Sequence, residues 1–157
     1  LVLSTLHTND APAAITRLLD LGVPSYLLQA TILGVMAQRL VRTLCPKCKQ
    51  PAGLREEDEV AWNNLVAPWK STLPATLYRP VGCLDCRRTG YQGRMGLYEI
   101  LLMSPEIKKR ITDRTDIAVL REQALREGMK TLRISGAKKV AAGMTTIAEI
   151  LKVTPDL

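Results

Sequence analysis

The sequence predicts an α/β fold that carries a small metal-binding insertion and ends in short helices. Three features of the chain support this prediction. It opens with an apolar run, a polar turn and a helical apolar pattern, two cysteine pairs lie further on, and capped helical patterns fill the last third. With 157 residues, 46% of them apolar, the chain can bury one or two aliphatic cores.

The charge of the chain permits several classes of partner without choosing among them. Its 22 basic and 15 acidic residues give a net charge of +7, which suits phosphates, acidic proteins or anionic lipid. No apolar run is long enough for a membrane span and no signal peptide opens the chain, so a cytoplasmic, reducing setting fits best. Because the first residues lack a Met and read as a strand already under way, we expect a piece of a longer protein.

The opening residues predict a strand, a polar turn and a helix. Residues 1–6 form the apolar run, Asp10 can cap the helix, Pro12 suits its first turn and Gly22 ends it. His7, the only histidine, lies in the turn. In α/β folds ligands bind at the carboxyl ends of strands, so His7 is a candidate functional residue, although a lone histidine is often a hydrogen-bonded bystander.

Residues 24–43 keep their apolar side chains at helical spacing and predict a second helix. Arg39 and Arg42 fall near its end. The helix dipole favours cations near a helix C-terminus, which is one explanation of both arginines. The alternative explanations are that they bind phosphate or lie in a subunit interface.

The four cysteines form two pairs, and each pair has the two-residue gap typical of a metal-binding knuckle. Cys45 and Cys48 make the first pair, Cys83 and Cys86 the second, and 34 residues (49 to 82) separate them. Two knuckles complete a tetrahedral four-thiolate shell, for which zinc is the usual occupant. Such a closed shell leaves no position for substrate, so the metal is expected to be structural. Two disulfides, or four unrelated core cysteines, are the alternative.

The segment between the knuckles is too small for a core of its own. Arg55 and the acidic run at 56–59 open a short amphipathic helix that Pro68 closes, and residues 77–81 predict a strand. After the second knuckle, Gly90, Gly93 and Gly96 indicate a hairpin bend that can bring Arg94 near an anion, and a strand is predicted over 97–102.

The last third predicts four short helices. Ser104 and Asp116 cap the first two, the third covers about 132–142, and the last covers 147–153. The string Gly128-Met129-Lys130-Thr131 lacks the glycine lead-in and the preceding strand of a phosphate loop. The 157 residues contain neither a Walker A motif nor an acidic Walker B strand end.

The order of these parts closely resembles the C-terminal part of the secretion ATPases, the assembly motors of bacterial type II secretion and type IV pili. The motifs that carry the resemblance, in chain order, are Thr5-Leu6-His7-Thr8-Asn9, Ala37-Gln38-Arg39-Leu40-Val41-Arg42, Cys45-Pro46-Lys47-Cys48, Gly82-Cys83-Leu84-Asp85-Cys86 and Gly90-Tyr91-Gln92-Gly93-Arg94-Met95-Gly96-Leu97-Tyr98-Glu99. The resemblance covers essentially the whole chain. The two cysteine pairs are similar to the zinc subdomain of the assembly branch, which the pilus-retraction branch generally lacks.

The resemblance implies a fold, a mechanism and partners. The chain would be the C-terminal portion of a RecA-like P-loop ATPase domain with a four-cysteine zinc subdomain and a C-terminal helical bundle. The intact protein would be a cytoplasmic homo-hexamer that binds ATP and magnesium and acts on platform proteins at the inner membrane; no nucleic acid is expected. His7 would lie near the terminal phosphate, with Arg94 a further candidate near the nucleotide. The fragment alone is expected to be inactive.

The same resemblance predicts subdomain boundaries. Residues 1–44 would be the end of the RecA-like core, 45–88 the zinc subdomain, 89–103 a returning hairpin and strand, and 104–157 the helical subdomain.

Two other functions are compatible with the residues. A nucleic-acid-binding zinc ribbon would use Lys47, Lys49, Arg87 and Arg88 on phosphates, but few aromatic residues are available to stack bases. A docking module would present a basic surface to an acidic protein or anionic lipid.

Overall fold

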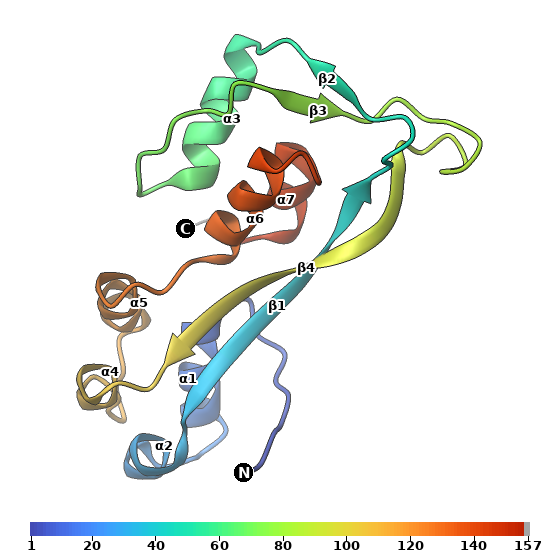
Figure 1. Cartoon of the computed structure of the whole chain (residues 1–157). Helices are drawn as coiled ribbons and strands as arrows, with labels where there is room; N and C mark the ends of the chain where they lie inside the picture. Colours follow the sequence, from blue (N-terminus) through green and yellow to red (C-terminus); the bar gives the residue numbers. More distant parts are fainter. Residues whose placement is uncertain (156–157) are drawn as a thin grey trace. The chain divides into compact units, whose positions relative to one another are not determined.

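The structure is a computed structural model that describes residues 1–155, and it is a mixed α/β fold (Figure 1). Its elements in chain order are α1 (Ala11–Asp20), α2 (Ser25–Thr31), β1 (Gly34–Leu44), β2 (Gln50–Ala52), α3 (Glu56–Val66), β3 (Leu77–Arg79), β4 (Tyr91–Leu102), α4 (Pro105–Lys109), α5 (Ile117–Arg126), α6 (Leu132–Ala141) and α7 (Ile147–Val153). Within residues 1–155, no helix is both long and apolar enough to cross a membrane.

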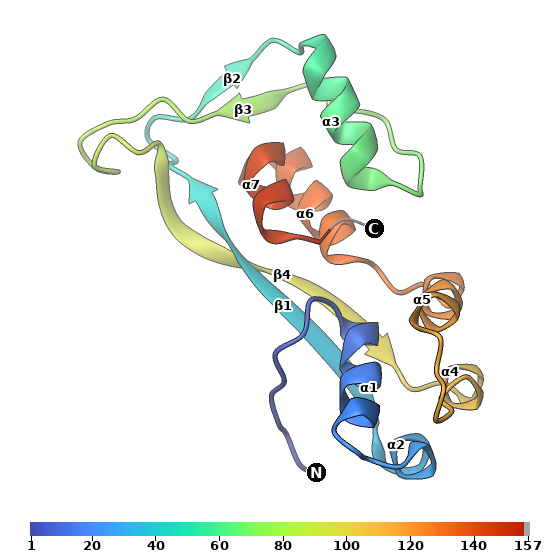
Figure 2. The same ribbon diagram turned by 180° about the vertical axis from the view of Figure 1, so that it is seen from behind.

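The residues group into two compact units. The first contains Leu1–Gln38 and Tyr98–Thr131, and the second contains Arg39–Leu97 and the residues from Leu132 onward. Strands β1 and β4 pair with each other, as both views of the ribbon show (Figure 2), and each contributes residues to both units. The predicted division into four subdomains stays a prediction.

The first helix of the first unit, α1, is the one that the sequence predicted. Asp10 caps α1 by accepting a hydrogen bond from the Ala13 N–H at 2.8 Å, and Pro12 lies in the first turn. Ser104 and Asp116 cap α4 and α5 in the same way, as predicted. The buried side chains that these elements share are those of Ala11, Ile15, Leu28, Ala37, Leu101, Met103, Ile107, Ile111, Leu120, Ala124 and Met129.

The predicted opening strand is wrong, because residues 1–8 have no regular secondary structure. Leu1, Val2 and Leu3 are almost fully exposed, and no strand of residues 1–155 pairs with them. A β-strand needs hydrogen bonds from a neighbouring strand, so an apolar run alone does not form one.

The predicted helix over 24–43 is also wrong beyond its first two turns. Only α2 is helical there, and β1 follows it. Along β1 the side chains alternate in burial: Ala37 and Val41 are buried, whereas Met36 and Leu40 are 62% and 51% exposed. Apolar residues were dense enough to satisfy both helical and strand spacing, and pairing with β4 selected the strand.

The second unit contains the segment between the knuckles and the last two helices. Helix α3 ends just before Pro68, as predicted, and β3 confirms the first three residues of the strand predicted over 77–81. Strand β3 pairs antiparallel with β2, with Gln50 opposite Arg79 and Ala52 opposite Leu77. The buried side chains of this unit's apolar core are those of Val41, Trp62, Leu65, Val66, Leu77, Leu97, Leu132, Ala137, Val140, Ile147 and Ile150.

The predicted glycine bend is shorter than expected, because β4 already begins at Tyr91. Gly90 alone of the three glycines precedes the strand, with φ +77°, and a Cβ there would lie 2.3 Å from the Pro80 Cβ. Gly90 is therefore required both by its left-handed backbone and by the close approach of Pro80.

Candidate metal centre

Two tight turns hold the four cysteines. Cys45 and Cys48 lie directly after β1, where the N–H groups of Cys48 and Lys49 donate to the Cys45 carbonyl at 3.3 and 2.9 Å. Cys83 and Cys86 lie between β3 and β4, where the Arg88 N–H closes the turn onto the Cys83 carbonyl at 2.7 Å. Each pair thus forms one knuckle, as the spacing predicted.

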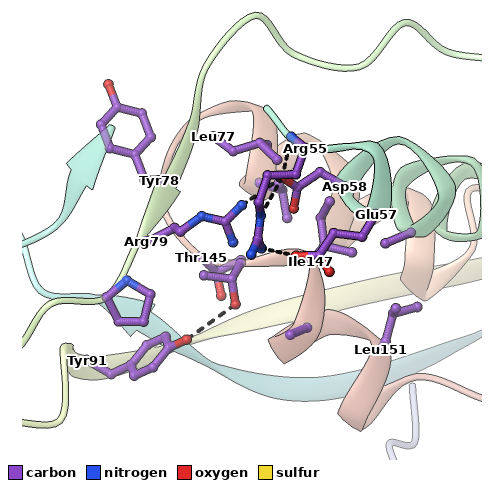
Figure 3. Close-up of a pocket in the computed structure, with 15 residues that line it drawn as sticks. Arg55, Glu57, Asp58, Leu77, Tyr78, Arg79, Tyr91, Thr145, Ile147 and Leu151 are labelled. Atoms are coloured by element: carbon purple, nitrogen blue, oxygen red, sulfur yellow. Dashed lines mark hydrogen bonds and ion pairs between the residues drawn. The ribbon is translucent and has the colours of Figure 1, made fainter. Parts of the chain in front are cut away.

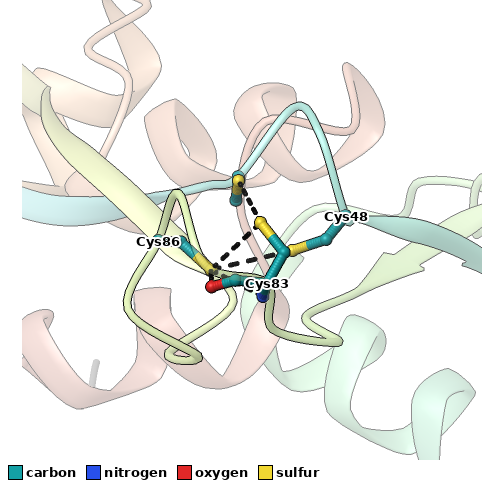
Figure 4. Close-up of side chains that lie close together, drawn as sticks. Cys48, Cys83 and Cys86 are labelled. Atoms are coloured by element: carbon teal, nitrogen blue, oxygen red, sulfur yellow. Dashed lines mark hydrogen bonds between the residues drawn. The ribbon is translucent and has the colours of Figure 1, made fainter.

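The two knuckles bring all four sulfur atoms together in the second unit (Figure 4). All Sγ atoms lie within 4.8 Å of one another. The Sγ–Sγ distance is 3.9 Å from Cys45 to Cys83 and 3.8 Å from Cys86 to both Cys48 and Cys83. A tetrahedron with zinc–sulfur bonds of about 2.3 Å has edges of about 3.8 Å, so the donor set fits a zinc ion.

The thiols are free, which excludes the two-disulfide alternative for this structure. Cys45 and Cys86 are buried, and Cys48 and Cys83 are partly buried. The four cysteines are therefore compatible with a closed, structural zinc site.

Backbone N–H groups point at two of the sulfur atoms. Cys86 Sγ accepts from the N–H groups of Cys83 and Gly90, both at 3.2 Å, and Cys48 Sγ accepts from the Gly82 N–H at 3.3 Å. The Cys83 N–H is the main reason why the pKa of Cys86 falls to about 6, whereas burial raises the pKa of Cys48 to about 11. These backbone donors therefore favour the thiolate form of Cys86.

The two lysines of the first knuckle, Lys47 and Lys49, have specific partners. Lys47 Nζ joins the two knuckles through Asp85 Oδ1 at 2.7 Å, in a pair whose side chains are 64% and 47% exposed. Lys49 Nζ donates to the Gly143 carbonyl at 2.7 Å and lies 4.7 Å from the centre of the Tyr78 ring. The first knuckle is therefore attached to the loop between α6 and α7.

Arg42 makes a second attachment close to the first knuckle, which sequence reasoning missed. Its Nε and Nη2 atoms donate to Glu149 Oε2 and Oε1 at 2.8 and 2.6 Å, and its guanidinium lies 4.2 Å from the Tyr91 ring centre. The Arg42 hydrogen bond lowers the pKa of Glu149 against the opposing effect of burial. The helix-dipole interpretation of Arg42 is wrong, because Arg42 lies in a strand. Its partner is 107 residues away, and no local pattern could identify it.

The candidate nucleotide residues lie in different units. His7 is exposed in the irregular opening segment of the first unit, and Arg94 is exposed on the part of β4 that belongs to the second unit. Among residues 1–155, His7 has no hydrogen bond or ion pair. The roles of His7 and Arg94 stay predictions.

A cavity of about 510 Å³ also lies in the second unit (Figure 3). Its charged wall is an ion-pair cluster, in which Arg79 Nη2 and the Arg55 N–H both donate to Asp58 Oδ2, at 2.6 and 3.0 Å. Burial raises the pKa of Asp58, but the hydrogen bonds from Arg55 and the charge of Arg79 outweigh it, so the pKa is lowered. These charges compensate one another within the wall.

Comparison with known proteins gives a consistent result over the whole chain. A family model described as "Type II/IV secretion system protein" matches residues 1–152. The chain is 46% identical over 155 residues to the type IV pilus assembly ATPase TfpB of Acinetobacter baylyi, covering 99% of this chain and 26% of that protein. It is 40% identical over 157 residues to the type II secretion system protein E of Aeromonas hydrophila and 39% identical over 156 residues to the type II secretion system ATPase E of Vibrio cholerae, covering 99% of this chain and 30% of each relative. The chain thus spans less than a third of the length of these relatives.

Proposed function

The chain belongs to the type II/IV secretion system protein family, and from this premise we propose that it is part of a hexameric cytoplasmic ATPase that drives pilus or pseudopilus assembly. The observation that carries this proposal is identity of 39–46% across essentially the whole chain to a pilus assembly ATPase and to type II secretion proteins. In this proposal residues 1–44 are the end of a RecA-like core.

The four cysteines hold a structural zinc ion in the proposed protein. The sulfur–sulfur distances of 3.8–3.9 Å and the absence of disulfides among the described residues support this assignment. Zinc would join the second knuckle to the first, which Lys49 attaches to the loop between α6 and α7. Arg42, at the end of β1, attaches the same region to α7 through Glu149. This arrangement, together with the cysteine motif, supports the proposal that the chain belongs to the assembly branch of the family.

His7 is proposed to lie near the terminal phosphate of ATP, and Arg94 near the nucleotide. Phosphoryl transfer depends mainly on preorganised charge and positioning. Bound ATP, together with magnesium, would supply the reacting phosphate. His7 would position or polarise that phosphate. The chain itself carries no Walker A or Walker B motif, so we propose that it does not turn over ATP alone.

The proposed partners are further copies of the same protein in a hexamer and the platform proteins of the bacterial inner membrane, where the motor would be peripherally bound. The zinc-ribbon alternative for nucleic acid has less support than the motor. Lys47 and Lys49, two of the four cations it required, are engaged by Asp85 and by the Gly143 carbonyl.

The test is a His7→Ala substitution in the full-length protein that contains this chain. We expect ATP turnover to fall by about 10- to 1,000-fold and the thermal midpoint to stay unchanged, because His7 is exposed. Asp20→Asn, an exposed change at the end of α1, is the control and should keep full activity. Unchanged turnover in His7→Ala would remove His7 from the site.

A further inference from the structure

The irregular segment that carries His7 is anchored at its end by buried carboxylates. Asp10 is 8% exposed and Glu99, on β4, is 4% exposed. Asp10 Oδ1 accepts from the Ala13 N–H, and Glu99 Oε1 accepts from the Ala11 N–H, both at 2.8 Å. Together they satisfy two of the N–H groups at the start of α1.

Helix α5 supplies the cation of this cluster. Arg121 Nη2 donates to Asp10 Oδ2 at 2.6 Å, across 111 residues of sequence. The Arg121 side chain is 30% exposed and that of Asp10 is 11% exposed, so the pair is shielded from water on one side. Asp10 therefore caps α1 through Oδ1 and pairs with Arg121 of α5 through Oδ2.

The cluster lies close enough to His7 to restrict it. Three residues of extended chain span at most about 11 Å, so the position of Asp10 limits where the His7 backbone can lie. Thr8 shortens the path further, because its Oγ1 donates to the Asp10 carbonyl at 3.1 Å. The segment from His7 to Asp10 is thus held in place at Asp10, and it carries the exposed imidazole at His7.

We propose that Arg121 is a positioning residue for His7, acting through Asp10, with Glu99 holding the other side of the same helix start. This proposal rests on the proposed nucleotide role of His7. It connects α5 to the residue that is proposed to lie near the terminal phosphate. A displacement of α5 would then change the position of the imidazole and so the rate of ATP turnover.

The first experiment uses the chain as it is and needs no nucleotide. His7 is the only histidine, so its imidazole gives a single set of NMR signals that reports on this segment alone. In Arg121→Gln, amide hydrogen exchange at Ala11 and Ala13 should be about tenfold faster than in the wild type, and the imidazole signals should shift. Arg121→Lys should recover most of the protection.

The matched control is Arg126→Gln. Arg126 lies on the same helix and pairs with Glu122 on the exposed surface, so its loss should leave Ala11, Ala13 and the imidazole unchanged. Equal exchange in Arg121→Gln and Arg126→Gln would overturn the proposal. Should Arg121→Gln unfold the first unit, Asp10→Asn keeps a capping oxygen and removes only the charge. Faster exchange in Asp10→Asn supports the proposal, and unchanged exchange overturns it.

The second experiment uses the full-length protein and separates the two proposals. Arg121→Gln should lower kcat about tenfold and leave KM for ATP within about twofold, because a positioning residue acts on the reacting geometry. If His7→Ala lowers turnover and Arg121→Gln does not, the positioning role is wrong. If His7→Ala itself has no effect, the nucleotide role of His7 fails, whereas the ion pair measured in the isolated chain still stands.

Discussion

The ion pair between Arg42 and Glu149 predicts an asymmetric pair of mutational effects. The Glu149 side chain is 6% exposed and that of Arg42 is 48% exposed. Arg42→Met leaves a buried carboxylate whose remaining cation is Lys152, with Nζ at 3.2 Å. Glu149→Gln instead leaves a guanidinium that water can reach. Replacing the exposed partner, Arg42, should therefore lower the free energy of unfolding more than replacing the buried partner, Glu149.

The expected costs in the free energy of unfolding are about 2–4 kcal/mol for Arg42→Met and about 1–2 kcal/mol for Glu149→Gln. The double variant should cost less than the sum, since neither charge is then left alone. Urea denaturation followed by tryptophan fluorescence measures this, because Trp62 and Trp69 both lie in the second unit. Glu57→Gln, which breaks the exposed pair with Arg55, is the control and should stay within about 0.5 kcal/mol. A larger cost for Glu149→Gln than for Arg42→Met would refute the reasoning.

Two further predictions concern the same unit. The pKa values of Glu149 and Asp58 are lowered in the folded chain, so their contribution to stability is present above about pH 4 and is lost as the pH falls through the folded pKa values. The urea midpoint should therefore fall steeply below about pH 4 in the wild type and less steeply in Glu149→Gln. Equal slopes in the two proteins would contradict this prediction. Gly136→Ala should destabilise the second unit by about 1–3 kcal/mol although alanine favours helices, because the alanine Cβ would lie 2.5 Å from Cγ2 of the fully buried Ile150. A raised urea midpoint in Gly136→Ala would contradict this prediction, since it would show that Ile150 has room to move.

Local signals predicted much of the structure. The caps at Asp10, Ser104 and Asp116 gave correct helix starts, since a side-chain oxygen two or three residues before a free N–H acts locally. The cysteine spacing correctly predicted that four sulfur atoms lie together. Each knuckle is a local turn that the spacing within a pair identifies, and two such knuckles complete one set of four metal ligands.

Long-range pairing explains what sequence reasoning missed. Nothing in residues 34–44 distinguishes a helix from a strand until β4 lies beside them. The partners of Arg42 and Arg121 are 107 and 111 residues away, so neither ion pair leaves a trace in local spacing. The opening run failed for the opposite reason, since its apolar pattern has no neighbouring strand among residues 1–155.

The metal content of the purified chain tests the central claim most directly. Chain prepared under reducing conditions without added metal, and analysed by inductively coupled plasma mass spectrometry, should contain a single zinc ion. A Cys83→Ser/Cys86→Ser variant should contain almost none, because two thiolates cannot complete a tetrahedral shell. Metal-free wild-type chain with four reactive thiols, or equal zinc in both proteins, would contradict the assignment of a structural zinc centre.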